Sequence, residues 1–501
     1  MDFSALQTPG KYILSVGDKR TKPFYIYEAN WESALWKTVY FFYQERCGTE
    51  VEGIHLPCHL DCFAVHPDGR RVSVGGGWHD AGDLSQGLCN TAESVHAFLD
   101  MAAKVEKKDP ELWDRLLEEA RWGLQWMMRT RFGDGYRCVW TTIGLWTKNI
   151  IGDSDDLTGR AYNDPFENFC AAAAEAAGAR VFRPLDPVFA DYCLRCAAED
   201  FQFALERMYL NHPKLSRPLP VEVQLYGQGL VAAMELYKVT SDTRYLENAV
   251  RMADVVLKCQ QQEFPDWDVP IRGFFYETRK HERPLAYDHR AHEQAPVMGL
   301  ALLCELASGH PKYPEWKKGL TLYAEYIKSI AGYCAPYGLL PSAIYKLDAP
   351  KVPDTLEDYN EQVRNGIRLS DKFYLRRFPV AFLFRGFFGV LLTKAKAAAV
   401  AARVLKDEEL LRIVQRQLEW ILGKNPFAQS FMYGEGYDFP PMYSEFANDM
   451  IGELPVGIQT FENHDIPFMP MMNSATYKEI WVHSSSRFLW TVADLYDPSN
   501  L

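Results

Sequence analysis

Residues 75–83 read Gly-Gly-Gly-Trp-His-Asp-Ala-Gly-Asp, and the rest of the chain is organised around this stretch. Two carboxylates, Asp80 and Asp83, stand three residues apart, with only small residues between them and three glycines upstream. Glycine adopts backbone conformations closed to other residues and lets a ligand approach the chain closely. Two acids in such a loop could hold a water molecule, a metal ion or a sugar hydroxyl. The stretch therefore predicts a functional site.

A structural interpretation of the same acids competes with this one. The segment Leu84–Val105 is apolar at helical spacing, which places Asp80 and Asp83 at a loop-to-helix junction. An Asp just before a helix is often an N-cap, whose carboxylate accepts hydrogen bonds from free backbone N–H groups. Capping would account for one acid and would leave the other, together with Trp78 and the glycines, unexplained. The sequence alone leaves both interpretations open.

Composition excludes several classes of function. Hydrophobic residues make up 48% of the 501 residues, so the chain is globular and not disordered. The net charge is −12 and no basic run occurs, which argues against nucleic-acid binding because phosphate neutralisation supplies most of that affinity. No apolar run reaches the roughly 18 residues of a membrane span. Aromatic residues reach 14%, which suits either a carbohydrate cleft or a dense helical core.

The cysteines indicate the surroundings in which the protein works. Eleven cysteines is an odd number for a complete disulfide framework. Four of them fall in helical patterns and are expected to be small buried hydrophobes, namely Cys170, Cys193, Cys196 and Cys304. Residues 1–22 lack the apolar core of a signal peptide. We therefore expect a cytoplasmic protein with reduced thiols, or a secreted one if upstream sequence is missing. The sequence gives no indication of oligomeric state.

From residue 30 onward about twelve segments carry apolar residues at three- and four-residue spacing, which predicts helices. They are Trp31–Arg46, Leu84–Val105, Pro110–Arg129, Phe166–Val181, Pro187–Met208, Val221–Thr240, Thr243–Gln261, Ala291–Ser308, Tyr313–Ile330, Val380–Leu405, Glu408–Leu422 and Thr476–Leu495. No recurrent apolar strand alternates with them, which argues against a parallel α/β sheet. The pattern predicts an all-α toroid of paired helices with its active site on loops at one end.

Residues 1–27 differ from everything after them. Lys11–Val16 and Pro23–Ile26 are predicted to be strands around a turn at residues 17–19. An isolated hairpin is marginally stable in water, so these strands must pack on something else. We expect the tail of a small β module at residues 1–27, followed by a helical domain at residues 28–501.

Three long loops are rich in polar and aromatic residues: Gly48–Asp83, Asp268–Gln294 and Gly423–Ser474. Loops longer than about 15 residues without secondary structure are uncommon in compact domains unless they serve a function. We therefore interpret them as the walls of a cleft. The residues predicted to contact the substrate on these loops are Trp78, Tyr433, Glu435, His289 and Arg290.

Cysteine and histidine residues gather just before the two acids. Two thiolates and two imidazoles form a good tetrahedral zinc set, and structural zinc sites of this kind are closed to water. The candidate ligands are Cys47, Cys58, His59 and His79. Competing candidates are His55, Cys62 and His66, and the alternative that these side chains are unconnected also stays open. A zinc ion here would fix the loop that carries Asp80 and Asp83, so its role would be structural.

With these residues assembled, the chain resembles glycoside hydrolase family 9, the inverting cellulase-type enzymes with an (α/α)6 barrel. Residues 76–83 are similar to the GGWxDAGD signature of the family. Residues 41–48 resemble the opening of catalytic domains that follow an immunoglobulin-like module. Residues 422–427 resemble the LGxNP segment, and residues 477–481 occupy the place of the late motif that carries the catalytic acid.

The resemblance assigns roles to individual residues. It makes Asp83 the general base, Asp80 its partner in holding the water, and Glu479 the general acid. It makes residues 1–27 a β-strand remnant of the immunoglobulin-like module. It also matches the cysteine–histidine set to a structural zinc site and allows for calcium, without ligands that we can assign. A structural alternative remains for Glu479, because a Glu in the first turn of the last helix would favour the helix dipole.

The chain also departs from the family pattern. Cellulases of this family usually carry a His-His-Arg segment after the LGxNP loop, whereas residues 439–446 contain neither His nor Arg. The usual Asp-His pair after the third helix is not found around Gly133–Trp146. The expected substrate is a β-1,4-linked glucan-type poly- or oligosaccharide. The alternative is an exo-acting β-glucosidase or β-glucosaminidase on short oligosaccharides, with Glu435, Glu445 and residues 288–293 offering carboxylates to an amino group.

Two further classes of function stay open. A carbohydrate-binding protein without catalytic turnover would keep the barrel and the sugar contacts. A lyase or isomerase on the same toroid would act on a related substrate by another reaction.

Overall fold

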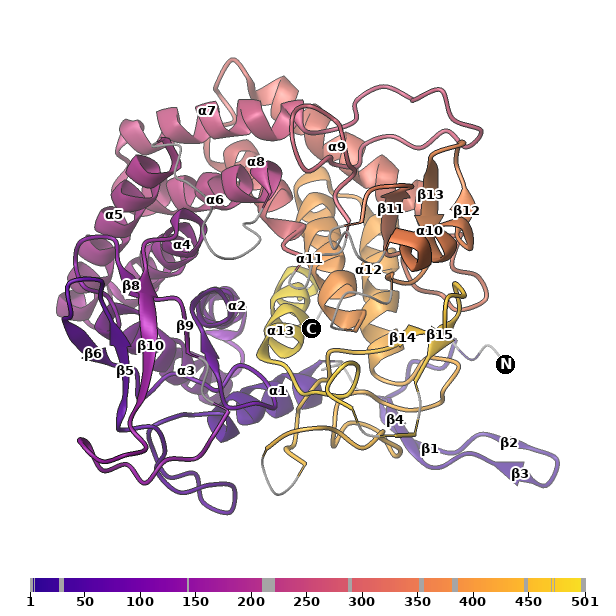
Figure 1. The fold of residues 1–501 in the computed structure, drawn as a ribbon. Coiled ribbons are helices and arrows are strands. Elements are labelled where there is room, and N and C mark those ends of the chain that lie inside the picture. Colours follow the sequence, from indigo (N-terminus) through magenta and orange to yellow (C-terminus); the bar gives the residue numbers. More distant parts are fainter. Residues whose placement is uncertain are drawn as a thin grey trace.

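The computed structural model describes residues 3, 5–26, 31–141, 144–209, 221–286, 291–350, 356–380, 386–445, 449–469, 471–472 and 474–496. Six helices form a closed inner ring in which each contacts the next and the last contacts the first. They are α2 (Leu88–Val105), α4 (Pro165–Phe182), α6 (Glu222–Thr240), α8 (Gln294–Leu306), α11 (Phe388–Leu405) and α13 (Val482–Leu495). The ring is the predicted all-α (α/α)6 barrel (Figure 1).

A second set of helices surrounds the ring, and each packs against an inner helix. These outer helices are α1 (Glu32–Gln44), α3 (Pro110–Arg129), α5 (Pro187–Tyr209), α7 (Thr243–Lys258), α9 (Tyr313–Ile330) and α12 (Glu408–Ile421). One shorter helix, α10 (Leu356–Arg364), lies outside this scheme. Its position was not predicted, because its sequence is polar and carries few apolar residues at helical spacing.

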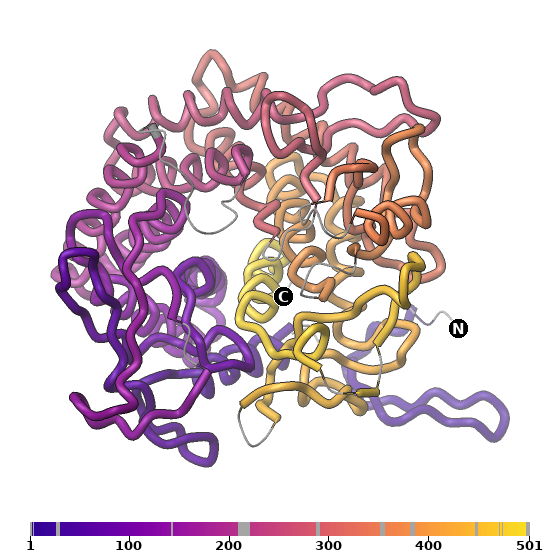
Figure 2. Tube along the Cα trace, in the orientation of Figure 1, coloured from indigo at the N-terminus to yellow at the C-terminus, as the bar shows by residue number. Residues whose placement is uncertain are grey.

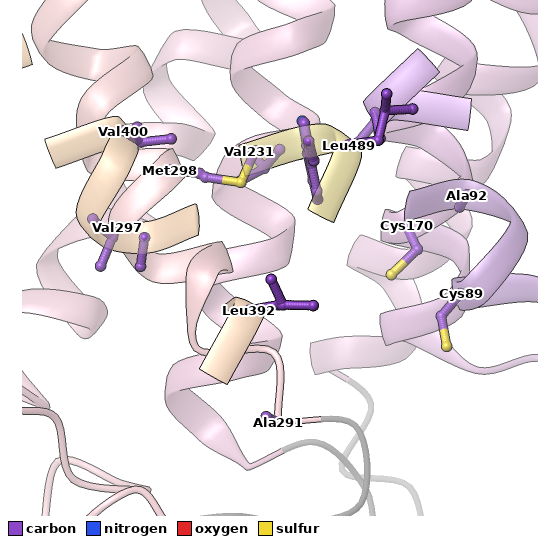
Figure 3. Close-up of a cluster of buried hydrophobic side chains, with 14 of the residues drawn as sticks. Cys89, Ala92, Cys170, Val231, Ala291, Val297, Met298, Leu392, Val400 and Leu489 are labelled. Atoms are coloured by element: carbon purple, nitrogen blue, oxygen red, sulfur yellow. The ribbon is translucent and has the colours of Figure 1, made fainter. Parts of the chain in front are cut away.

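The two rings differ because their sequences differ. The inner helix α4 is rich in alanine and is buried along nearly all its length. The outer helix α12 is apolar on one face only and exposes the other to water, as expected of a helix at the surface. Figure 3 shows inner-ring side chains packed together inside the barrel, among them Cys89, Ala92, Cys170, Val231, Met298 and Leu489. Small side chains on α4 allow its neighbours to approach closely.

Three predicted helices begin four or more residues later in the structure than the periodicity indicated. Helix α2 begins at Leu88 and not at Leu84, α11 at Phe388 and not at Val380, and α13 at Val482 and not at Thr476. Before α2 and α13 the chain is extended and its backbone pairs with other loops, so apolar residues there are buried without forming a helix. These two corrections concern the segments that carry the predicted catalytic residues.

Strands occupy the edges of the barrel. At the N-terminus β1 (Gly10–Tyr12) pairs with β4 (Phe24–Ile26), and β2 (Ser15–Val16) pairs with β3 (Lys19–Arg20). This hairpin points away from the ring (Figure 1). Strands are present as expected, but the predicted strand Lys11–Val16 is divided into β1 and β2, and β3 was not predicted. Their origin in an immunoglobulin-like module stays a prediction.

Two of the long loops contain short strands that the sequence did not indicate. β5 (Cys62–Val65) lies between β6 (Arg71–Ser73) and β10 (Leu157–Tyr162), and β10 also pairs with β8 (Arg137–Cys138). β7 (Gln86–Gly87) pairs with β9 (Trp140–Thr141), and β14 (Gln459–Thr460) with β15 (Pro467–Phe468). A further sheet has the order β11 (Ala343–Lys346), β13 (Phe373–Arg376), β12 (Ile367–Arg368). The loops are therefore partly ordered by pairing with distant segments.

All eleven cysteines are buried and none forms a disulfide. The prediction that Cys170, Cys193, Cys196 and Cys304 are small buried hydrophobes is confirmed. In the part of the chain that the structure describes, no helix is both long and apolar enough to cross a lipid bilayer.

Closure of the ring brings the two ends of the chain together. Because α13 packs against both α2 and α11, the loop before α2 and the segment before α13 lie side by side. The trace in Figure 2 follows the chain around the ring, so that its last helix lies beside α2. Gly82 lies at this junction, where a Cβ would stand 2.5 Å from the carbonyl oxygen of Tyr443 and 3.2 Å from Cγ of Glu479.

Replacing Gly82 by Ala should therefore force these segments apart. We expect Gly82→Ala to lower the free energy of unfolding by about 1–3 kcal/mol, the usual cost of overpacking a close contact. Gly309→Ala is the control, because a Cβ at Gly309 meets nothing within 4 Å. Urea denaturation measures both variants, and equal stability of the two would contradict the predicted steric conflict.

Candidate active site and metal centre

Asp80 and Asp83 lie in one compact loop. The hydroxyl oxygen of Ser85 is 2.5 Å from Oδ1 of Asp80 and 2.7 Å from Oδ1 of Asp83. The backbone N–H of Ser85 also donates to Oδ1 of Asp83, at 3.2 Å. From the first turn of α2, the side-chain amide of Asn90 donates to Oδ2 of Asp80, at 2.6 Å. Asp80 is 2% exposed and Asp83 is half-buried, so Asp83 is the more accessible acid.

The capping interpretation of these acids is wrong. The N-cap residue of α2 is Gly87, which supplies no side-chain capping hydrogen bond. The hydrogen bond from Ser85 N–H to Asp83 closes a local turn inside the loop and leaves α2 uncapped. The two carboxylates are therefore held for a reason other than helix initiation.

Glu479 lies beside this loop although it comes from the far end of the chain. Its segment is extended: Glu479 pairs with Tyr443, and Trp481 pairs with Ala81. Hydrogen bonds from Gly82 N–H to Ile480 O (3.1 Å) and from Val482 N–H to Asp80 O (3.0 Å) join the two segments. Because α13 begins only at Val482, Glu479 is not in the first turn of the helix and the dipole interpretation is wrong.

The predicted metal ligands come together in a second, adjacent cluster. Cys47, Cys58, His59 and His79 are all buried, and their ligand atoms lie within 4.8 Å of one another. Among the residues that the structure describes, this is the single group of three or more His, Cys, Asp or Glu side chains arranged to hold a metal ion. Two competitors lie outside this group: Cys62 is in β5, and the ring nitrogens of His66 face the carboxylates of Asp68 and Asp134. The third, His55, is not in the group but lies beside it, with its ring 5.6 Å from that of His79.

The cluster favours metal binding in its electrostatics and in its outer contacts. The hydrogen bond with Cys47 lowers the pKa of the Cys58 thiol although burial opposes this, so one thiolate is already favoured. His59 Nε2 lies 3.1 Å from the carbonyl oxygen of Leu145, which fixes a proton on Nε2 and leaves Nδ1 to bind a metal. The four residues that the sequence proposed as ligands thus lie together in the structure, whereas their spacing alone did not exclude others.

The structure supports only part of the set of residues predicted to contact the substrate. Trp78 is 2% exposed, and its indole N–H donates to Glu119 Oε2 at 3.0 Å, so the prediction that Trp78 contacts the substrate is corrected to a core role. The carboxylate of Glu435 pairs with Lys37 at 2.9 Å. Tyr433 is half-buried and its ring packs against Phe439. His289 and Arg290 lie outside the described residues.

One buried ionic cluster near the loop was not predicted. Glu93, one turn along α2 from Asn90, is buried between groups from α13 and from the start of α8. Its carboxylate accepts hydrogen bonds from His292 Nδ1 (2.7 Å), Gln294 Nε2 (2.8 Å) and Arg487 Nε (3.0 Å), and lies 3.2 Å from His483 Nε2. In the sequence, this cluster was indicated by a charged residue, Glu93, within the apolar pattern of an inner helix.

The charges in this cluster decide the protonation of Glu93. Burial alone would raise the pKa of Glu93, but the charge of Arg487, followed by those of His483 and His292, outweighs it and leaves the pKa well below its usual range. The carboxylate is therefore ionised. It joins α2 to α8 and α13, one helical turn further along α2 than Asn90, the residue that donates to Asp80.

Comparison with known proteins agrees with this geometry. A sequence model described as glycosyl hydrolase family 9 matches residues 31–444. Endoglucanase D of Acetivibrio thermocellus is 27% identical over 296 residues, which cover 53% of this chain and 47% of that protein. The cellodextrinase of Butyrivibrio fibrisolvens is 25% identical over 301 residues, covering 54% of this chain and 53% of that protein. The chain thus spans about half the length of the curated relatives it matches.

Solved structures share the fold along nearly the whole chain. A metagenome-derived glycoside hydrolase family 9 endoglucanase has a TM-score of 0.69 at 20% identity, covering 99% of this chain and 86% of that chain. A Zn-binding triple mutant of another family 9 endoglucanase has a TM-score of 0.67 at 17% identity, covering 99% and 90%. At these identities the likeness concerns the fold.

A closed ring of six helix pairs, with acids from both ends of the chain meeting in one site, defines an (α/α)6-barrel protein of the glycoside hydrolase class. With the match over residues 31–444, the chain belongs to glycosyl hydrolase family 9.

Removal of the main counter-ion of Glu93 should destabilise the barrel. We expect Arg487→Met to lower the free energy of unfolding by about 3–5 kcal/mol at pH 7, because it leaves a buried carboxylate without its cation. Since the folded-state pKa of Glu93 is depressed, the ion pair stabilises the fold above the unfolded pKa of about 4.3. The loss should therefore shrink as the pH falls below that value.

Urea denaturation at several pH values measures this difference. The control is Arg115→Met, which removes an exposed pair with Glu118 that contributes about 0–1 kcal/mol. An equal effect of the two substitutions at pH 7 would show that the buried pair has no special contribution.

Proposed function

We propose that this chain hydrolyses β-1,4-linked glucan-type poly- or oligosaccharides with inversion at the anomeric carbon. The observation that carries the proposal is the junction at Gly82, where the loop of Asp80 and Asp83 meets the extended segment of Glu479. Hydrolysis with inversion needs one protonated acid at the leaving oxygen and one carboxylate that activates water on the opposite face. Acids from two separate segments can meet this requirement.

The roles of the three acids follow from their surroundings. Glu479 is 2% exposed, and burial favours the neutral form that a general acid needs. Asp83 is half-buried in a polar loop, where its ionised form can act as the general base. Asp80, held by Ser85 and Asn90, is the second carboxylate that orients the water.

The reaction then takes place in a single displacement. Water held by Asp80 and Asp83 attacks the anomeric carbon and gives a proton to Asp83. The bond from that carbon to the bridging oxygen breaks, and Glu479 transfers its proton to the departing oxygen. Regeneration moves one proton from Asp83 to Glu479 through solvent, so the atoms and charges balance over one cycle.

Substitution of either acid should abolish most of this activity. We expect Asp83→Ala and Glu479→Ala each to lower kcat by about 10²–10⁴-fold, the usual contribution of a general base or acid. Release of reducing ends from β-1,4-linked gluco-oligosaccharides measures kcat. Proton NMR should detect the α-anomer as the first product. Glu408→Ala is the control, since its side chain is exposed in the first turn of the outer helix α12.

The same assay separates the alternatives. The panel contains gluco-, glucosamino-, xylo- and mixed-linkage oligosaccharides, with products sized. Cleavage of single residues from glucosamino chains would favour the exo-acting β-glucosaminidase, for which Glu445, bonded through its backbone to Gly82, offers a carboxylate at the site. Calorimetric binding without product would favour a carbohydrate-binding protein. An ultraviolet-absorbing product would favour a lyase.

We also propose that the cysteine–histidine cluster holds a structural zinc ion. Zn–S bonds of about 2.3 Å and Zn–N bonds of about 2.05 Å in a tetrahedron separate two sulfurs by about 3.8 Å, two nitrogens by about 3.4 Å, and sulfur from nitrogen by about 3.6 Å. The distances are 3.8 Å for Cys47–Cys58, 3.4 Å for His59–His79, 3.5 Å for Cys47–His59 and 3.6 Å for Cys58–His79.

Four protein ligands leave no open position for a catalytic water, so the metal would stabilise the loop. We expect about one equivalent of zinc by elemental analysis. Cys58→Ser should lose the metal and lower the melting temperature. Cys62→Ser, which alters a buried cysteine outside the ligand set, should keep the metal. Carefully prepared wild-type protein without metal would overturn the zinc proposal.

A further inference from the structure

Glu45 lies between the metal centre and the catalytic loop. It follows the last residue of α1 and is fully buried. Its backbone runs beside the stretch that precedes Asp80: the carbonyl of Glu45 accepts from His79 N–H at 2.9 Å, and Cys47 N–H donates to Gly77 O at 2.9 Å. Two residues on from Glu45 is the metal-ligand candidate Cys47, so one short segment contacts both sites.

The proposed reaction does not explain why the carboxyl group of Glu45 is buried at this position. Neither carboxylate oxygen has a hydrogen-bond partner among the described residues. Oε2 lies 3.7 Å from Nδ1 of His79, its nearest basic group. Taking a carboxylate out of water costs several kcal/mol unless a donor or a cation compensates it. A buried carboxylate without a hydrogen-bond partner at this position therefore indicates a nearby N–H donor. Its hydrogen bond to Glu45 would strengthen when the metal is bound.

His79 can be that donor. Its Nε2 faces the other ligands, 3.6 Å from Cys58 Sγ and 3.4 Å from His59 Nδ1, so the proton of a metal-bound His79 lies on Nδ1. Nδ1 is the atom that faces Glu45. A histidine bound to a metal usually donates its other N–H to a carboxylate or a carbonyl, which fixes the ring and increases its basicity. For His59, the Leu145 carbonyl is that acceptor.

We propose that Glu45 is a positioning residue that accepts the Nδ1–H of metal-bound His79 and so couples the metal centre to the loop of Asp80 and Asp83. This proposal rests on the metal site proposed above. Since Asp80 directly follows His79, a fixed His79 ring fixes the start of the catalytic loop. Glu45 itself touches no substrate.

The test compares two substitutions of Glu45 with one of Glu175. Glutamine at position 45 keeps a neutral acceptor oxygen, whereas alanine removes the acceptor. Glu175→Gln is the matched control, because Glu175 is an equally buried carboxyl that lies on α4, where its Oε1 is 3.9 Å from Nη2 of Arg137. The zinc-loaded full chain is mixed with a chromophoric chelator at neutral pH, and the release rate of zinc is recorded.

We expect zinc release to be about 10–100-fold faster in Glu45→Ala, the usual effect of losing such an acceptor, with Glu45→Gln between it and the wild type. Glu175→Gln should release zinc at the wild-type rate. The melting temperature of metal-free Glu45→Gln should match that of the metal-free wild type, which separates the predicted role from a general loss of stability. Wild-type release rates in both Glu45 variants would overturn the proposal, whereas absence of zinc from the wild type would overturn the metal site itself.

Discussion

The backbone pairing of residues 80–82 with residues 480–482 is the contact on which the rest of the site depends. Two hydrogen bonds make this pairing, and the missing side chain of Gly82 lets the two segments approach. Both segments lead directly into inner helices, α2 and α13, which are neighbours because the ring is closed. Ring closure thus determines which residues meet, and the pairing determines how closely.

Below this contact the barrel tolerates charge only where it is compensated. The inner helices are largely apolar, so an ionised Glu93 inside them requires Arg487 and the two histidines around it. The cluster joins three inner helices near their N-terminal ends, one layer below Asp80. A buried network of this kind makes the relative positions of those helices more specific, because a shift in one would leave a charge without its partner.

The sequence predicted the helices well because their apolar residues recur at three- and four-residue spacing in long segments. It failed where apolar residues are buried for another reason. Ile480 and Trp481 continue the helical pattern of α13, yet they lie in an extended segment that pairs with loops. Trp78 was misplaced because an aromatic ring beside catalytic acids suits a sugar platform as well as a core. Its contact with Glu119 on α3 depends on helix packing that no local pattern indicates.

The candidate site was likewise predictable where it depends on residues close together in the sequence. It was not predictable where it depends on contacts that form only in the folded chain. The four candidate metal ligands, Asp80 and Asp83 lie within one stretch of chain, and residue type alone indicated the chemistry proposed for them. The role proposed for Glu45 was not recognisable in this way, because a carboxylate at the end of an apolar helix does not by itself indicate a function. Its position facing His79 becomes apparent only in the folded structure. His79 and Asp80 are consecutive residues assigned to two different proposed centres, so any force that fixes the His79 ring also limits the conformations open to Asp80. A metal ion held by His79 would therefore take no part in the chemistry and would still determine how accurately the loop of Asp80 and Asp83 is held.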